Sequence, residues 1–349
     1  MTIAYFGWTE PAPPLCWMAT KREAFMRADR RVFGGGVVAS LLAPSAAWAQ
    51  QGWASGRVVH IVVPFPPAGA TDIIARILGD KLARMWNASV IVDNKAGGGS
   101  NIGGEYVARA APTGETLMMA APFVALNTYL FKKLTYDPAA DFQHVSLVAL
   151  VPNMLIAGKH LNVATVAELI AYGKANPGKL TFASAGVGSS IHLAGELFKS
   201  MTGVDMVHVP YKGSAPAIQD IIGGRVDIMF DNISSSLEQV RSGQLVGVAI
   251  TTAKRSKLAP QLPPIADTVP GYDVSSWFGL SAPKNTPRGI VDAIAADTKT
   301  ALADPDVRAK LEALAAEPVG SSPEEFTAFV AKESAKWGKL IVDQHISAE

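Results

Sequence analysis

The sequence predicts an α/β protein in which strands and helices alternate along the chain. The first observation is a unit that recurs three times, in which an apolar strand leads through a loop of small residues into a helix start. The second is that helical patterns separate most of the strands, which implies right-handed crossovers and mainly parallel sheets. The three units are residues 58–78 (VVHIVVPFPPAGATDIIARIL), 89–108 and 180–198.

In the first part of the chain, short apolar runs predict strands, and runs with helical spacing follow them. We expect strands at 58–63, 90–94 and 116–121, with helices at 71–86 and after the glycine loop 97–100. The apolar stretch 144–158 is longer than one strand needs, so we interpret it as a crossing from a first domain into a second.

The second part repeats the alternation. We expect helices at 166–176, 190–198, 215–223 and 234–242, and strands at 180–184, 205–211, 226–230 and 246–251. Residues 274–282 are interpreted as the crossing back, and helices are expected at 290–303, 305–315 and 323–344. The last part also has two expected helix starts, Thr286-Pro287 and Ser322-Pro323, each with a capping residue before a proline.

Two crossings divide the chain into two predicted domains. We expect an export signal with its upstream segment at 1–49, domain 1 at 50–150 plus 277–349, and domain 2 at 151–276. Two α/β domains joined by two crossing segments is the layout of a hinged periplasmic binding protein. A ligand would then lie between the domains, at the carboxyl ends of the strands.

Composition limits the possible partners and the compartment. The chain has 349 residues, of which 49% are hydrophobic and 17% charged, and a formal net charge of +1, so it is globular and has no basic surface that would favour nucleic acid. Basic residues before the apolar run 32–43, and then Ala47-Trp48-Ala49, predict a signal cleaved near Ala49 for the periplasm. Arg30-Arg31 leaves a twin-arginine signal and an ordinary Sec signal both open. The start at Met1, Met18 or Met26 is open too.

Catalysis finds little support in the sequence. The single cysteine, Cys16, lies before the predicted cleavage site, and the six histidines have no metal-ligand spacing. Neither H-E-x-x-H nor G-x-S-x-G occurs. We therefore expect no catalytic residues, no metal and no cofactor. An exported α/β enzyme acting on a carboxylate, and a solute sensor for a signalling partner, are kept as alternatives.

From the export signal to the C-terminus, the chain resembles one family of receptors. The resemblance is carried by VPFPPAGATDIIAR (63–76), VDNKAGGGSNIGGEYVARAAPTGETL (92–117), FASAGVGSSIHLAGELF (182–198) and VHVPYKGSAPAIQDIIGGRVDIMFDN (207–232). These segments resemble the extracytoplasmic solute receptors of tripartite tricarboxylate transporters, the TctC or Bug family. The resemblance implies a Venus-flytrap fold of the type II periplasmic binding proteins and no catalysis.

The same resemblance implies the ligand and the partner. Members bind di- or tricarboxylates, acidic amino acids or aromatic carboxylates, and deliver them to the membrane permease subunits of a tripartite tricarboxylate transporter. We expect a monomer and no nucleic-acid partner.

The first loop is the principal candidate for carboxylate binding. The backbone N–H groups from Ala68 through Gly69 and Ala70 to Thr71 would hold one carboxylate, and Phe65 would line the cleft. Alanine at position 68 departs from the family's Pro-Gly-Gly, which leaves the loop conformation open. Asp72 either caps the helix or receives an ammonium or hydroxyl group of the ligand.

The other candidates come from the later loops and strand ends. The loop before Asn101 reads G-x-G-x-x-x-G, which is not a dinucleotide fingerprint, so it is either cleft-lining or structural. His192 is either a packing residue or a ligand contact, and Tyr211 and Asp231 are either ligand contacts or turn formers. The candidates of the third unit for the second domain's hold on the ligand are Ser184, Gly186, Gly188 and Ser189.

Overall fold

The structure is a computed structural model that describes residues 53–348. The predicted export signal, with Arg30-Arg31 and Cys16, lies outside the described residues. No helix among residues 53–348 has the length and apolar character needed to cross a membrane.

Except for the last of them, which was not predicted, the strands lie where the apolar runs predicted them, with shifts of one or two residues at most ends. They are β1 (Val58–Val63), β2 (Ser89–Asn94), β3 (Thr116–Ala120), β4 (Phe142–Gly158), β5 (Leu180–Ser184), β6 (Met206–Pro210), β7 (Ile228–Asn232), β8 (Leu245–Ile250), β9 (Ser275–Pro283) and β10 (Glu317–Pro318).

The helices follow the predicted pattern except for one, α3, that apolar periodicity did not reveal. They are α1 (Ala70–Trp86), α2 (Asn101–Ala108), α3 (Phe123–Leu130), α4 (Val166–Ala175), α5 (Ser190–Thr202), α6 (Ser214–Ile222), α7 (Ile233–Arg241), α8 (Arg288–Ala303), α9 (Pro305–Glu312) and α10 (Pro323–Asp343). One predicted cap is wrong, because α8 is capped by Pro287 without a side-chain bond, while the Thr286 hydroxyl donates to Pro283 O at 2.8 Å. The Ser322 cap of α10 is confirmed as a capping box with Glu325.

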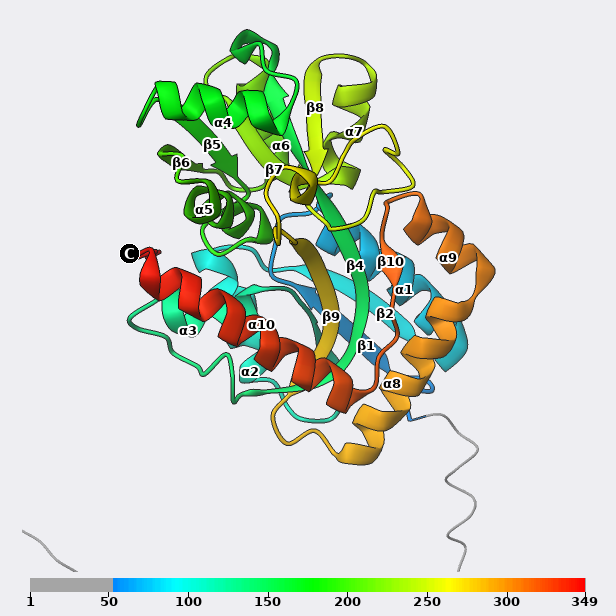
Figure 1. Cartoon of the computed structure of the whole chain (residues 1–349). Coiled ribbons are helices and arrows are strands. Elements are labelled where there is room, and N and C mark those ends of the chain that lie inside the picture. The colour runs from blue at the N-terminus through cyan, green and yellow to red at the C-terminus, as the bar shows by residue number, and fades with distance from the viewer. Residues whose placement is uncertain (1–52, 349) are drawn as a thin grey trace, which may run out of the picture. The chain divides into compact units, whose positions relative to one another are not determined.

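Parallel strands form both ends of the sheet, and antiparallel strands join them. The order is β2-β1-β3-β9-β4-β7-β5-β6, with β8 and β10 both paired to β4. The β1–β2, β1–β3, β5–β6 and β5–β7 pairs are parallel, whereas β9 and β4 are antiparallel to their neighbours. The 17-residue β4 pairs with β9 over its first part and with β7 and β8 over its last part, so a single strand serves both ends of the sheet (Figure 1).

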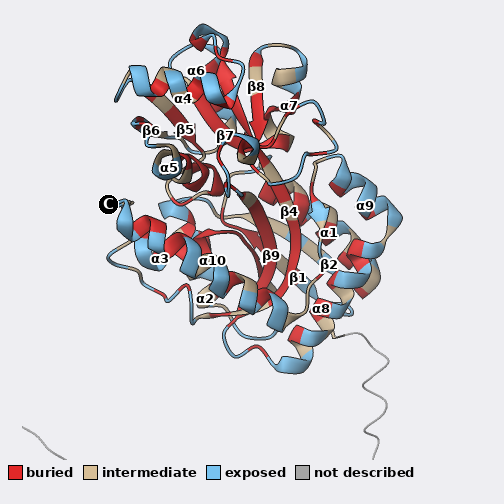
Figure 2. Cartoon of the chain, viewed as in Figure 1, coloured by how far each residue is buried: buried red, intermediate tan, exposed pale blue. Residues whose placement is uncertain are grey.

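The hydrophobic core lies along these strands. Buried residues run along β4, β7 and β9, while the outer sides of the helices are exposed (Figure 2). Trp277 of β9 is fully buried and packs edge-on against Phe326 and Phe329 of α10, with ring centroids 5.8 and 5.5 Å apart. Burial of such aromatic side chains is worth a few kcal/mol each. The pairing of β9 with α10 therefore anchors the C-terminal helix to the sheet.

A buried polar network lies where β4 and β9 pass between the two ends of the sheet. The side-chain oxygen of Asn153 (β4) accepts hydrogen bonds from Asn232 at 2.7 Å and from Ser276 (β9) at 2.9 Å. Asn153 Nδ2 donates to Phe230 O at 3.0 Å, and the Ser276 hydroxyl lies 2.5 Å from that of Ser190. Because Ser190 is the first residue of α5, the network fixes the start of α5 against the crossing strands.

Glycine is required at one contact of this core. A Cβ at Gly279 of β9 would lie 2.2 Å from the ring of Phe326 and 2.9 Å from Ser146 O, whereas a Cβ at Gly289 of α8 would meet nothing within 4 Å. We expect Gly279→Ala to lower the free energy of unfolding by about 1–3 kcal/mol through overpacking. Gly289→Ala is the matched control and should raise it by up to about 1 kcal/mol. Urea unfolding of both variants measures this; equal effects would contradict the described packing.

Candidate functional site

The loop between β1 and α1 ends in an open helix start. Gly69 caps α1 with extended backbone and no side-chain hydrogen bond, so the first amides of the helix have no acceptor among the described residues. Ala70 and Thr71, the first two residues of α1, are buried. Unpaired amides at the positive end of a helix dipole attract an anion.

Ala68 adopts a backbone conformation that favours glycine. Its φ is 67°, in the left-handed region, which costs an alanine about 1–2 kcal/mol. The Ala68 N–H donates to Asp72 Oδ2 at 3.0 Å, so this amide faces Asp72. Of the amides predicted to hold a carboxylate, the structure leaves those of Gly69, Ala70 and Thr71 without a partner among the described residues.

Asp72 holds the loop from inside rather than capping the helix. It is 3% exposed, and its two oxygens accept hydrogen bonds from Arg76, from Asn94 at 3.0 Å and from Ala68. Burial would raise the pKa of Asp72, but the bonds from Arg76, Ala68 and Asn94 hold it below the usual value. The expected capping role is wrong, because Gly69 occupies the cap.

Phe65 and Asn94 complete the surroundings of this loop. Asn94 also donates to Phe65 O at 3.1 Å, which ties the ends of β1 and β2 together. The half-buried ring of Phe65 packs edge-on against Phe123 of α3 at 6.3 Å.

The loop before Asn101 is held by a residue that the sequence reading missed. Residues 97–100 all have positive φ, and Asn101 Oδ1 accepts from Asn127 Nδ2 at 2.7 Å and from Tyr136 Oη at 2.9 Å. Asn127, on α3, is 1% exposed and its Oδ1 has no partner among the described residues. That oxygen lies 3.7 Å from where a Cβ of Gly188 would be, so Asn127 lies between the Asn101 and Gly188 loops. One indication of this residue was present in the sequence, a lone asparagine in the apolar run FVALNTYL.

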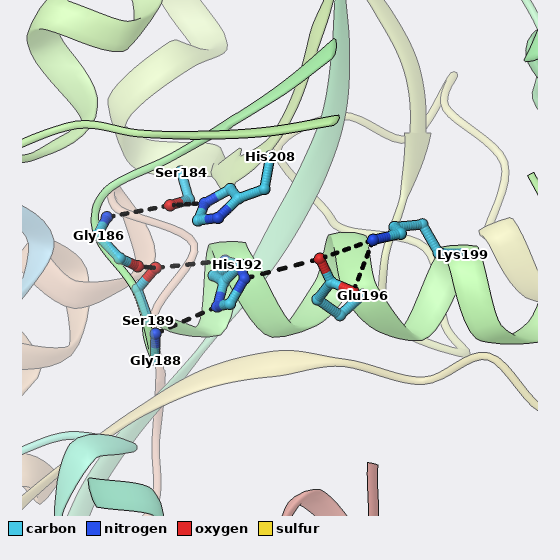
Figure 3. Close-up of polar contacts among 8 residues, drawn as sticks. All are labelled: Ser184, Gly186, Gly188, Ser189, His192, Glu196, Lys199 and His208. Carbon is cyan, nitrogen blue, oxygen red and sulfur yellow. Dashed lines mark hydrogen bonds and ion pairs between the residues drawn. The ribbon is translucent and has the colours of Figure 1, made fainter. Parts of the chain in front are cut away.

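The loop between β5 and α5 is closed by its own hydrogen bonds (Figure 3). Ser184 Oγ accepts from Gly186 N at 3.1 Å and lies 2.7 Å from His208 Nε2. Ser189 caps α5, accepting from His192 N and donating to Gly186 O at 2.7 Å. The four candidates of this loop therefore lie together, and Ser190 and Ile191 hold the α5 amides that have no acceptor among the described residues.

His192 points into this loop and not away from it. Its ring is 3% exposed, and Nδ1 accepts from Gly188 N at 3.2 Å. The ring stacks on His208 of β6, which the sequence reading did not select, with centroids 4.0 Å apart.

Tyr211 and Asp231 stand at the ends of β6 and β7. The Tyr211 phenol donates to Asp220 Oδ2 at 2.7 Å, and burial together with Asp220 raises the pKa of Tyr211 to about 12. Asp231 is fully buried; one oxygen accepts from Ser214 at 2.5 Å and the other has no partner among the described residues. Burial raises the pKa of Asp231 to about 7.

The described surface has one hollow beside Arg57 and Asn87, and another beside Phe131 and Tyr136, next to the Asn101 loop. Neither includes a predicted site residue. The structure thus brings the candidates together in two groups, around Asp72 and around His192, with Asn127 between Asn101 and Gly188.

The two parallel ends of the sheet are joined by two crossing strands, the layout predicted for a periplasmic binding protein. Residues 74–346 match the model of the tripartite tricarboxylate transporter family receptor, TctC. The chain belongs to this family, so the predicted resemblance, fold class and receptor role are confirmed, as is the expectation that it is not an enzyme. Membership also places the receptor in the periplasm.

Three similar proteins illustrate the relationship. A UPF0065 protein in the tcbD-tcbE intergenic region of Pseudomonas sp. (strain P51) is 36% identical, covering 91% of this chain and 95% of that one. The structure of R. palustris Rpa4515 with adipate is 39% identical with a TM-score of 0.78, covering 82% and 96%. MatC from Rhodopseudomonas palustris with bound malate is 32% identical with a TM-score of 0.74, covering 82% and 99%.

The conformation of Ala68 can be tested by removing its methyl group. We expect Ala68→Gly to raise the free energy of unfolding by about 0.5–1 kcal/mol, because glycine adopts positive φ without steric cost. Ala96→Gly, at an exposed loop residue without positive φ, should lower it by up to about 1 kcal/mol. Chemical unfolding decides; a loss of stability in both variants would show that Ala68 is not left-handed.

The buried carboxyl group of Asp231 should make stability depend on pH. Its pKa is about 7 when folded and ordinary when unfolded, so the cost of burying its charge is present above pH 7 and lost as the pH falls. Relative to wild type, Asp231→Asn should therefore gain on the order of 2–3 kcal/mol more stability at pH 8 than at pH 5. Exposed Asp205→Asn is the control, and the same gain at both pH values for Asp231→Asn would refute the assignment.

Proposed function

We propose that this receptor binds a small dicarboxylate between the β1–α1 loop and the β5–α5 loop and delivers it to the permease of a tripartite tricarboxylate transporter. The observation that carries the proposal is the open helix start of α1, whose first amides face no acceptor among the described residues. A carboxylate supplies the acceptors and the charge that such a helix start favours.

The second helix start gives the site its other end. At α5, the amides of Ser190 and Ile191 have no acceptor among the described residues, while those of Gly186, Gly188 and Ser189 are used inside the loop. Two such starts suit a solute with an anionic group at each end. In this arrangement Phe65, which follows β1, and Asn127, whose Oδ1 lies 3.7 Å from the position of a Cβ at Gly188, would serve as side walls.

The side chains near the loops favour binding by backbone dipoles. Arg76 is paired with Asp72 at 2.8 Å, and Lys199 with Glu196 at 3.0 Å, so both cations are already neutralised. Neutral donors held in place bind an anion without the cost of removing water from a free cation. The two similar R. palustris proteins were solved with the dicarboxylates adipate and malate, which supports this solute class.

The remaining expectations complete the proposal. The receptor is exported by a signal cleaved near Ala49, acts as a monomer, and closes by a hinge between domain 1 (50–150 plus 277–349) and domain 2 (151–276). The β4 and β9 segments that pair with each other are the connections at which such a hinge would lie. Tyr211 and Asp231 lie at strand ends on the β5 side of this arrangement.

Binding is tested with purified mature protein. Adipate, malate, citrate, glutamate and benzoate are each added at millimolar concentration, with adipamide as the uncharged control. We expect at least one dicarboxylate to raise the melting temperature without being consumed, since a ligand at 100 times its Kd stabilises by about 2.7 kcal/mol. No shift with any acid, or an equal shift with adipamide, would contradict the proposal.

A proline at the first position of α1 tests directly whether the Ala70 N–H binds the solute. Ala70→Pro removes one N–H at a position where proline fits a helix, and Gly69 before it already has extended backbone. We expect dicarboxylate affinity to fall about tenfold or more by calorimetry, with little change in stability.

Arg288→Pro is the matched control, since Arg288 begins α8 behind the extended Pro287, away from both loops. It should leave the affinity unchanged. Unchanged affinity in Ala70→Pro would exclude this amide from the site.

A further inference from the structure

Two histidines, the buried His192 and the half-buried His208, stack directly behind the β5–α5 loop. The parallel register of β5 and β6 pairs Phe182 with His208, and their rings stack with centroids 4.9 Å apart. His192, in the first turn of α5, continues the stack at 4.0 Å from His208. The carboxyl end of one strand pair and the start of a helix are thus joined through three rings.

The ring nitrogens of this stack hold the loop backbone. His192 Nδ1 accepts the Gly188 N–H at 3.2 Å, so Nδ1 carries no proton, and Nε2 faces Glu196 Oε1 at 3.7 Å. His208 Nε2 bonds Ser184 Oγ, which itself accepts the Gly186 N–H (Figure 3). Two amides of the loop therefore end on the histidine pair, one directly and one through Ser184.

Both amides belong to glycines with positive φ, 131° at Gly186 and 79° at Gly188. A loop with two such residues has many accessible conformations, and fixing it costs entropy. With these amides turned inward, the open amides at Ser190 and Ile191 remain for a solute. The stack thus determines which donors of the loop are available.

We propose that His192 and His208 are positioning residues, which as a neutral pair fix the 184–190 loop for binding and do not touch the solute. The inference rests on the proposed function, and it replaces the ligand-contact reading of His192. The contact reading is disfavoured because the ring is 3% exposed and its Nδ1 is occupied by Gly188. A metal site is not indicated either, since no cluster of three candidate ligands exists among the described residues.

The charges around the pair favour its neutral form. Burial lowers the pKa of His192 well below the usual value, with His208 and Lys199 adding to the effect, and burial with Lys199 lowers the pKa of His208 to about 4. Among the described residues, the charged groups in contact with the stack are Glu196 and Lys199 of α5, which pair with each other; β5 contributes the uncharged Phe182 and Ser184. If His192 gained a second proton, its Nδ1 would become a donor and would face the Gly188 N–H, which is also a donor.

The test compares variants that keep or remove each acceptor. His192→Asn keeps an oxygen near the place of Nδ1 and His208→Gln one near the place of Nε2, whereas His192→Leu and His208→Phe remove them. We expect the Leu and Phe variants to bind dicarboxylate about tenfold more weakly, and the Asn and Gln variants to stay within about threefold of wild type. His144→Asn is the control, because His144 is a histidine whose pKa burial lowers to about 4 but which bonds Ser281 away from the loop.

Amide hydrogen exchange of the ligand-free protein separates this inference from the proposed function. The Gly186 and Gly188 amides should exchange at least about tenfold faster in the Leu and Phe variants, with β4 amides unchanged, whether or not a carboxylate binds. If wild type binds no carboxylate, the proposed function fails, and the exchange data alone decide the positioning role. If either substituted variant does not fold, the Asn and Gln variants and the pH profile decide it.

The pH profile gives a readout that simple packing would not. Wild-type affinity should fall more steeply than that of His208→Gln as the pH approaches 4, because burial and Lys199 lower the pKa of His208 to about 4 and only wild type gains a proton at position 208. The ratio of the two Kd values cancels the titration of the solute itself. The positioning role is overturned by unchanged exchange at Gly186 and Gly188, by a Kd ratio of wild type to His208→Gln that does not change as the pH approaches 4, or by equal binding of the Leu and Asn variants.

Discussion

The antiparallel pairing of β4 with β9 is the constraint on which the rest of this receptor depends. Parallel strands at each end of the sheet meet only through these two strands, because β3 joins β9 and β7 joins β4. The amides and hydroxyls of Asn153, Asn232 and Ser276 bond one another at the passage, buried from water. Leaving any of them unpaired would cost about 1–3 kcal/mol, so the network also holds the start of α5 in place.

The site that we propose is built from backbone amides rather than from cations. Asp72 neutralises Arg76 and at the same time holds the Ala68 amide, and Glu196 neutralises Lys199 beside the histidine stack. In each loop, side chains accept hydrogen bonds from backbone amides that precede the helix, namely Ala68 in one loop and Gly186 and Gly188 in the other. The first amides of each helix have no acceptor among the described residues. In the proposed site, binding strength depends on how rigidly the loops are held, so the half-buried His208 would matter as much as the residues that face the solute.

Periodicity predicted nearly every strand and helix, because apolar spacing depends on local burial. It failed at α3, where six of eight residues are buried and no polar face marks a helix. Asn127 was missed with it. His208 was missed because its contact with Phe182 depends on the register between β5 and β6, which a local sequence pattern does not show. The candidate loops were found from the sequence, but the partner of each amide depends on tertiary contacts, as the Ala68–Asp72 bond shows.

The most direct measurement is a crystal structure of the mature protein with the dicarboxylate that raises its melting temperature most. The account predicts a solute carboxylate within hydrogen-bond distance of the amides of residues 69–71, the other carboxylate at the start of α5, and the His192 ring turned to Gly188. A carboxylate bound instead by an arginine or lysine side chain, with the α1 amides facing water, would contradict it.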